Sequence, residues 1–145
     1  MNRKFNFIIF FFIASLFMPY LVNAAQPITT DNRIKTYVYN ENEVFLVVVH
    51  MGYQASIEFA KGEEIETLSI GDNYSWKITP VGRRIFIKPF EESIHTNMTV
   101  VTNKRTYQFD LASKSVDPDK IDMELAYVIR FYYPDEKKSK VDMAS

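Results

Sequence analysis

The fold is decided by residues 52–111, which run GYQASIEFAKGEEIETLSIGDNYSWKITPVGRRIFIKPFEESIHTNMTVVTNKRTYQFDL. In three places within this stretch, apolar and polar residues alternate on both sides of a turn signal, as they do in β-hairpins. The expected hairpins join residues 55–59 to 63–70 through Lys61-Gly62, residues 74–79 to 84–88 through Pro80-Val81-Gly82, and residues 98–102 to 105–112 through Asn103-Lys104. The stretch therefore predicts a protein built from short strands.

Further strands are expected on both sides of this stretch. Residues 33–40 alternate with period two, whereas residues 43–50 are apolar on both faces and predict a central strand covered on both sides. After a polar connector at residues 113–122, the aromatic and β-branched residues 125–133 predict one more strand. The charged residues that follow Pro134 show no periodicity, so we expect a flexible tail there.

About seven or eight short strands at regular spacing favour an all-β, immunoglobulin-like sandwich. A small outer-membrane barrel is the alternative, but it needs longer strands with an uninterrupted apolar outer face. Here the outward positions include Glu58, Lys77 and Asp110, which favours the sandwich. The expected division of the chain is a signal peptide at 1–24, the sandwich at 25–112, the connector at 113–122, an additional strand or linker at 123–134 and a flexible charged tail at 135–145.

The first residues predict export to the periplasm. Arg3 and Lys4 precede an apolar run at residues 7–18, which suits a secretory signal peptide better than a membrane span, although an uncleaved anchor is the alternative. Small residues around Ala24 predict cleavage after that position, with cleavage after Ala25 as the alternative. The chain has 17 basic and 18 acidic residues, and they are interspersed, which speaks against a nucleic-acid-binding surface.

Residue types that carry out catalysis or bind metals are sparse. The chain has no cysteine, so neither a disulfide nor a cysteine-ligated metal is expected. Its two histidines, His50 and His95, are interpreted as ordinary strand-end or loop residues rather than zinc ligands. No nucleophile, zinc or phosphate-loop motif is present, so we expect a non-enzymatic protein without a cofactor.

Two clusters of acidic residues are candidate sites. Adjacent glutamates at a hairpin are more typical of a solvated edge than of an acid/base pair, and this applies to Glu63, Glu64 and Glu66. The second cluster lacks the central glycine and the final glutamate of a calcium loop, so we interpret it as linker. It comprises Asp117, Asp119 and Asp122.

Aromatic residues point to a core and to an interface. Trp76 is in phase with the apolar residues of its strand and is expected in the core. The strand at 125–133 has aromatic residues on both faces, so it either covers the edge of the sandwich or offers itself to a partner. The predicted interface residues are Tyr127, Ile129, Phe131, Tyr132 and Tyr133.

Several short motifs occur in a distinctive order. They include Gly52-Tyr53-Gln54, Ile57-Glu58-Phe59, Ile78-Thr79-Pro80, Ile87-Lys88-Pro89 and Thr96-Asn97-Met98-Thr99-Val100. Across about residues 31–135, this order resembles the amino-terminal domain of the conjugation and type IV secretion family that includes TrbG, CagX and the ninth VirB subunit.

The resemblance implies a periplasmic β-sandwich in the ring-shaped core complex of a type IV secretion system. Its implied partners are a full-length homologue and an inner-membrane-anchored VirB-type scaffold, with no nucleic acid. The family's carboxy-terminal domain has no counterpart in this sequence, which leaves contact with the small lipoprotein in doubt. The alternative is a free periplasmic binding module, such as a chaperone or inhibitor, that uses residues 125–133 for strand addition.

Overall fold

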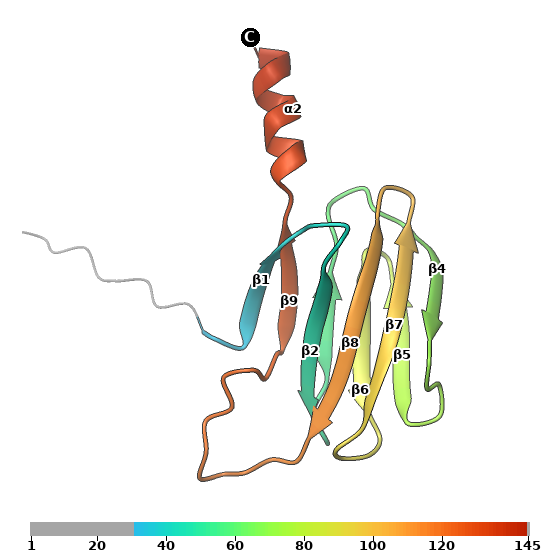
Figure 1. Ribbon diagram of the computed structural model, residues 1–145, viewed down its shortest axis with the longest axis vertical. Helices are drawn as coiled ribbons and strands as arrows, with labels where there is room; N and C mark the ends of the chain where they lie inside the picture. The colour runs from blue at the N-terminus through green and yellow to red at the C-terminus, as the bar shows by residue number, and fades with distance from the viewer. Residues whose placement is uncertain (1–30, 145) are drawn as a thin grey trace, which may run out of the picture.

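The computed structural model describes residues 31–144, so the predicted signal peptide lies outside the described residues. Within them, the chain forms two packed β-sheets and a helix (Figure 1). The elements are β1 (Ile34–Val38), β2 (Val44–His50), β3 (Ala55–Glu58), β4 (Ile65–Ile70), β5 (Trp76–Val81), β6 (Arg84–Pro89), β7 (His95–Thr102), β8 (Thr106–Lys114), β9 (Val128–Tyr132) and α2 (Pro134–Ala144). No helix among them has the length and apolar character needed to cross a membrane.

The prediction of an all-β sandwich is confirmed, with nine strands in the described part of the chain. One sheet has five strands in the order β1-β9-β3-β6-β5, and the other has four in the order β2-β8-β7-β4. Both sheets are mixed, because β9 runs parallel to β1 and β3, and β2 runs parallel to β8. The sandwich therefore departs from two purely antiparallel sheets.

The core lies between the sheets, as the alternation of the strands requires. Tyr107, Phe109 and Leu111 of β8 point inward and are almost fully buried, as predicted. Trp76 is also in the core, with 3% of its surface exposed. Its indole Nε1 has no hydrogen-bond partner among the described residues, which is rare for a buried donor.

Two of the three predicted hairpins are confirmed, and one is wrong. β5 pairs with β6 and β7 pairs with β8, but β3 and β4 belong to different sheets. The β5–β6 turn also lies later than predicted, because Val81 and Arg84 are paired and enclose Gly82 and Arg83. Gly62 does have the positive φ expected of it, 81°, but it sends the chain across to the opposite sheet.

The prediction that residues 43–50 form a central strand is wrong in position, since β2 is an edge strand of its sheet. Its second half is nevertheless buried on both faces, because the chain before β9 covers it. The Ala126 amide donates to the Val48 carbonyl over 3.0 Å, and the Tyr37 hydroxyl donates to the Leu46 carbonyl over 2.7 Å. Neighbouring segments thus occupy carbonyls that an edge strand would otherwise expose.

Replacing Tyr37 by phenylalanine is expected to lower the free energy of unfolding by about 1 kcal/mol, the usual net contribution of one hydrogen bond. The substitution keeps the aromatic ring, so the change in free energy measures only the hydrogen bond from the Tyr37 hydroxyl to the Leu46 carbonyl. Urea unfolding of the wild type and Tyr37→Phe measures it. Equal unfolding midpoints would contradict a stabilising role for this cap.

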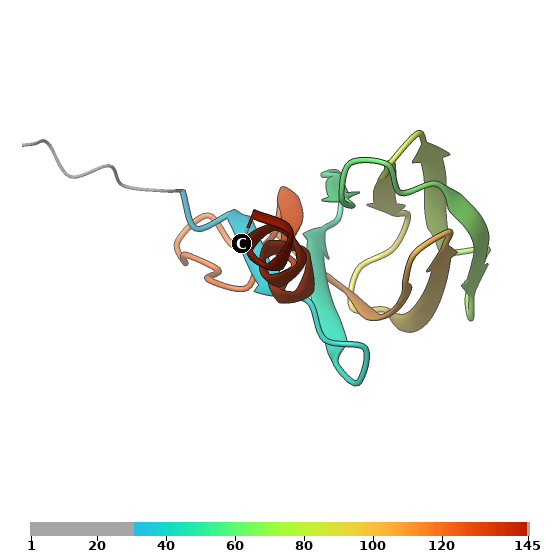
Figure 2. The same cartoon turned by 90° about the horizontal axis from the view of Figure 1, so that it is seen from above.

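The charged residues after Pro134, for which a flexible tail is predicted, are helical over α2 (Pro134–Ala144). Pro134 ends the strand and also suits the first turn of a helix, where its missing amide hydrogen is not needed. Asp135 and Glu136 follow in the first turn, where carboxylates favour the helix dipole. The helix has no buried residue and projects beyond the end of the sandwich (Figures 1 and 2).

Candidate interaction site

A buried ionic cluster closes the end of the sandwich from which α2 projects. It centres on Glu63, whose side chain is fully buried, so the prediction of a solvated edge is wrong for this residue. Glu64 and Glu66 are exposed, as predicted. The Glu63 carboxylate forms an ion pair with Arg105 and accepts hydrogen bonds from the Tyr107 hydroxyl (2.8 and 2.9 Å).

The local chain geometry explains how a glutamate reaches this position. The turn at Gly62 brings Glu63 beside the β7–β8 loop, and the Asn103 side chain holds the two segments together. Its amide nitrogen donates to the Gly62 carbonyl over 3.1 Å, and its oxygen accepts from the Glu64 amide over 2.9 Å. The Thr102 hydroxyl, 3.0 Å away, also contacts the Glu63 carboxylate.

Arg105 connects this cluster to the end of β9 and to α2. Its guanidinium pairs with Glu63 and, over 3.0 Å, with Glu136 in the first turn of α2. It also lies 3.9 Å from the ring centroid of Tyr133, a cation–π distance. Burial alone would lower the pKa of Arg105, but the hydrogen bonds to Glu136 and Glu63 outweigh it and raise that pKa.

Two tyrosines complete the cluster through a hydroxyl contact of 2.8 Å between Tyr107 and Tyr133. Burial raises the pKa of the Tyr133 hydroxyl to about 12. Burial also raises the pKa of Tyr107, and the contacts with Tyr133 and Glu63 raise it further. Both phenols remain protonated at neutral pH and can donate hydrogen bonds. The Glu63 carboxylate is thus surrounded by donors. We call Glu63, Arg105, Tyr107 and Tyr133 the clamp, because their contacts hold separate segments of the chain together.

The raised pKa of Tyr133 predicts a loss of stability in alkali. An unfolded tyrosine deprotonates at about pH 10, whereas the folded Tyr133 holds its proton to about pH 12. The contribution of Tyr133 to the free energy of unfolding should therefore be fully present below pH 10 and be lost as the pH rises toward 12. Denaturant unfolding at several pH values measures the fall. In Tyr133→Phe the fall should be shallower, and an unchanged slope would contradict the assignment.

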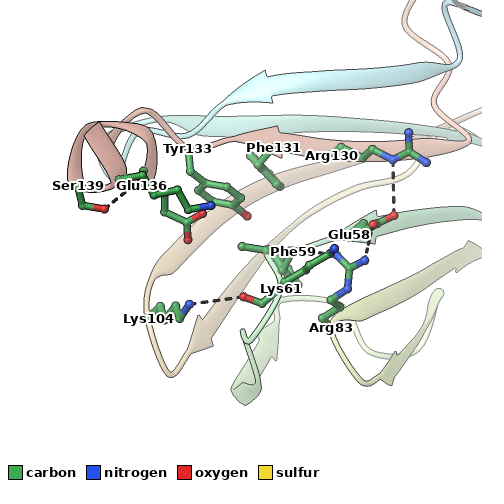
Figure 3. Close-up of a pocket in the computed structure, with 12 residues that line it drawn as sticks. Glu58, Phe59, Lys61, Arg83, Lys104, Arg130, Phe131, Tyr133, Glu136 and Ser139 are labelled. Carbon is green, nitrogen blue, oxygen red and sulfur yellow. Dashed lines mark hydrogen bonds and ion pairs between the residues drawn. The ribbon is translucent and has the colours of Figure 1, made fainter. Parts of the chain in front are cut away.

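A groove lies beside this cluster, with a volume of about 490 Å³ (Figure 3). Its floor is aromatic and its rim is mainly basic, and it lies between α2, the end of β9, and the turns that follow β3 and β5. The lining residues are Glu58, Phe59, Ala60, Lys61, Arg83, Lys104, Arg130, Phe131, Tyr133, Glu136, Ser139 and Lys140.

One carboxylate in the groove forms ion pairs with three arginines. Glu58, with a side chain 14% exposed, lies 2.9 Å from Arg83, 3.1 Å from Arg84 and 3.5 Å from Arg130. A single negative charge cannot neutralise three guanidinium groups, since the pKa of arginine keeps all of them charged. The arginines therefore leave this wall of the groove positively charged.

A second surface feature is an exposed apolar patch on the outer face of β1 and β9. Val38 and Tyr132 are neighbours in the parallel register, and they are 60% and 45% exposed. Ile34, on the same face of β1, is 37% exposed. We call Ile34, Val38 and Tyr132 the outer patch. Exposed apolar side chains gathered on one sheet face are typical of interaction sites.

Among residues 31–144, no strand covers the edge of the five-stranded sheet at β1. In a parallel pair, every second residue of a strand directs its backbone amide and carbonyl to the neighbouring strand. Arg33 and Tyr39 bond β9 in this way, so the backbone groups of Thr36, which is out of phase with them, point away from β9. Within residues 31–144, the backbone amide and carbonyl of Thr36 have no partner. At the opposite edge, by contrast, β5 carries Pro80, which cannot donate a hydrogen bond to an added strand.

The structure places the five predicted interface residues in different environments. Ile129 is fully buried, and Phe131 packs among core aromatic rings, with the Phe45 ring 4.8 Å away. Tyr133 belongs to the clamp and lines the groove. Tyr127 is half-buried at the end of the sandwich away from α2, and the Arg33 guanidinium lies over its ring, 4.7 Å from the centroid. Tyr132 is exposed in the outer patch.

The other predicted candidates lie at strand ends and in the connector. His50 ends β2 and its Nε2 lies 3.0 Å from a carboxylate oxygen of Asp122, while His95 begins β7. Asp117 pairs with Lys120 in the connector. Among the described residues, histidine and acidic side chains form no group of three or more that could hold a metal ion.

Sequence reasoning missed Glu63, Arg105 and the arginines around Glu58. The alternation of β8 did predict that Tyr107 points inward, and a buried tyrosine hydroxyl needs a partner. That requirement was the available signal for a nearby polar group, but the partner is 44 residues away in the sequence. No pattern in a single sequence indicates which of three neighbouring glutamates supplies it.

Comparison with known proteins gives a consistent result. A family model described as "CagX: Conjugal transfer protein" matches residues 32–144, which include the whole described sandwich and α2. The type IV secretion system protein virB9 of Bartonella quintana (strain Toulouse) is 28% identical over 97% of this chain and 51% of its own length. The type IV secretion system protein PtlF of Bordetella pertussis is 32% identical over 72% of this chain and 44% of its own length.

The chain thus spans about half the length of the curated relatives that it matches. The family match covers every strand and the helix that the structure describes, so it applies to the fold as a whole. The resemblance noted in the sequence motifs is confirmed by it. The chain belongs to the CagX family of conjugal transfer proteins.

Proposed function

We propose that this protein is a non-catalytic structural subunit of the periplasmic core complex of a type IV secretion system. The family match over residues 32–144 carries the proposal, because it covers the complete sandwich, and relatives are named as type IV secretion proteins. The proposed partners are a full-length homologue and an inner-membrane-anchored scaffold within a ring-shaped assembly, without contact to nucleic acid. The proposed location is the periplasm.

The surface of the sandwich supports assembly by protein–protein contact. The outer patch presents apolar side chains from two adjacent strands, and the open edge at Thr36 lies beside it. Apolar side chains and unpaired edge groups are features by which β-proteins recognise partners. Of the predicted interface residues, Tyr132 is the most exposed candidate, since Ile129 is buried in the core and Phe131 packs against it.

Affinity purification of the tagged protein from its native host, in mild detergent, tests the proposal. The expected result is recovery of other secretion-system core subunits in one large assembly. Recovery of the protein as a monomer, without any secretion-system subunit, would overturn it.

A charge placed in the outer patch is expected to weaken this association. Tyr132→Glu should reduce the recovery of partner subunits about tenfold, because burying an unpaired carboxylate in an interface is costly. Tyr74→Glu is the matched control, since Tyr74 is 90% exposed and lies in the β4–β5 loop. Equal recovery with both variants would remove Tyr132 from the interface.

A second candidate function is a free periplasmic binding module, and the open edge of β1 favours it. Strand addition at residues 125–133 is ruled out by the fold, because β9 already has β1 and β3 on its two sides. Addition at β1 would instead pair a partner strand with the backbone groups of Thr36, which point away from β9. A one-to-one complex in solution, in place of a large assembly, would support this second candidate.

A further inference from the structure

The groove at the α2 end of the sandwich has more positive charge than its own carboxylates can neutralise. Its lining contains five basic side chains, Lys61, Arg83, Lys104, Arg130 and Lys140, against the two carboxylates of Glu58 and Glu136. Both carboxylates are already engaged, Glu58 by three arginines and Glu136 by Arg105. The three lysines have no ion-pair partner among the described residues.

The floor of the groove suits a peptide chain. The partly exposed rings of Phe131 and Tyr133 offer apolar surface, and the basic side chains stand around them (Figure 3). Glutamate combines an apolar stem with a charged head, so its side chain would contact both. Arg130 is paired with Glu58 through its Nε, and its terminal N–H groups can bind a second carboxylate with two parallel hydrogen bonds.

The helix that forms one wall of the groove supplies a separate observation. α2 has no buried residue, yet Glu136, Ser139 and Lys140 face the groove. A short helix that is polar on all sides is rarely stable without tertiary contacts. A chain lying in the groove would contact α2 and the sandwich together, and would so supply contacts that the helix lacks.

From these observations we infer that the groove binds an extended acidic segment of a partner protein. Charge complementarity selects carboxylates, and the aromatic floor favours a protein chain over a bare anion. A nucleic-acid strand is disfavoured because the chain as a whole has a net charge of −1, without the excess of basic residues that is typical of nucleic-acid-binding domains. This inference rests on the proposed function, for which it names a partner-binding surface.

Binding of a fluorescein-labelled oligoglutamate peptide to the purified protein at low salt tests the inference. The variant Lys61→Glu/Lys140→Glu should bind about tenfold more weakly, since two attractive charges become repulsive. The control is Lys77→Glu/Lys88→Glu, which makes the same change in net charge at two exposed, paired positions on β5 and β6. It should bind within about twofold of the wild type, and binding should weaken with added salt.

Several outcomes would overturn the inference. These are equal loss of binding in both double variants, no binding of oligoglutamate by the wild type, or tighter binding of single-stranded DNA, inorganic phosphate or phosphatidylglycerol vesicles. Circular dichroism of each variant confirms that the sandwich is retained.

Purification from the native host separates this inference from the proposed function. If the wild type enters the secretion assembly and Lys61→Glu/Lys140→Glu enters equally well, the groove does not bind the partner but the proposed function stands. If the wild type itself does not enter the assembly, the proposed function fails. If Lys61→Glu/Lys140→Glu does not enter the assembly while the Lys77→Glu/Lys88→Glu control does, the result supports both the groove as a partner-binding surface and the proposed function.

Discussion

Arg105→Met is expected to lower the free energy of unfolding by about 3–5 kcal/mol, the usual cost of leaving a buried charge without its partner. The Glu63 side chain is fully buried, so water cannot replace the lost guanidinium. Its remaining donors, the hydroxyls of Tyr107 and Thr102, are uncharged. Urea or guanidinium unfolding, followed by circular dichroism, measures the loss.

A second substitution isolates the cause of this loss. Adding Glu63→Gln to Arg105→Met should recover most of the stability, because a neutral amide oxygen can still accept from Tyr107 without carrying a buried charge. The matched control is Arg84→Met, which removes one of three arginines from Glu58 and should cost less than about 1 kcal/mol. If Arg105→Met costs no more than Arg84→Met, the clamp does not stabilise the fold.

Phe131→Ala is expected to cost about 3–5 kcal/mol, the range for removing a large aromatic side chain from a packed core. Its ring contacts aromatic residues from both sheets and from the segments around them, with centroid distances of 4.8 Å to Phe45 and 5.1 Å to Tyr107. The loss would leave a cavity at the point where β9 meets the opposite sheet. Thermal or denaturant unfolding measures it.

The neighbouring residue provides the control for this prediction. Tyr132 lies next to Phe131 on β9 but points to the outer face, where it is 45% exposed. Tyr132→Ala should therefore change the free energy of unfolding by no more than about 0.5 kcal/mol. Equal effects of the two substitutions would mean that β9 is not an integral strand of the sandwich in solution.

Much of the fold could be predicted from local patterns. The alternation of Tyr107, Phe109 and Leu111 identified the inner face of β8, and short turns identified the β5–β6 and β7–β8 hairpins. These features depend on contacts between residues close in sequence, so period and turn chemistry are sufficient to indicate them. The failures concern pairings over longer distances, and for these no local signal exists.

The assignment of β3 and β4 shows why. Both segments alternate and a glycine with positive φ separates them, which is also the pattern of a hairpin. Only the positions of β6 and β7, which pair with them in different sheets, decide that the chain crosses between layers. In the same way, the apolar second half of β2 is buried by residues 125–126 and not by two flanking strands.

At the candidate site, too, local patterns indicated some residues and long-range contacts determined the others. The sequence suggested that the aromatic residues around β9 are involved in contacts, and Tyr132 and Tyr133 do line the outer patch and the groove. It did not indicate that Glu63 is buried or that α2 contacts the cluster, because the shared partner, Arg105, is 42 residues from Glu63 and 31 from Glu136. Electrostatic partners of this kind are set by three-dimensional proximity.

For this protein, the sequence by itself determined the all-β class, the inward faces of the strands and the family, since these follow from residue periodicity and from motifs in a fixed order. The tertiary structure alone decided that residues 52–111 do not form the sandwich by themselves. β9 completes the five-stranded sheet by lying between β1 and β3, and so brings Tyr133 and α2 to Arg105. The reason is physical, because parallel pairing of distant segments depends on the packing of the whole core and leaves no trace in local sequence.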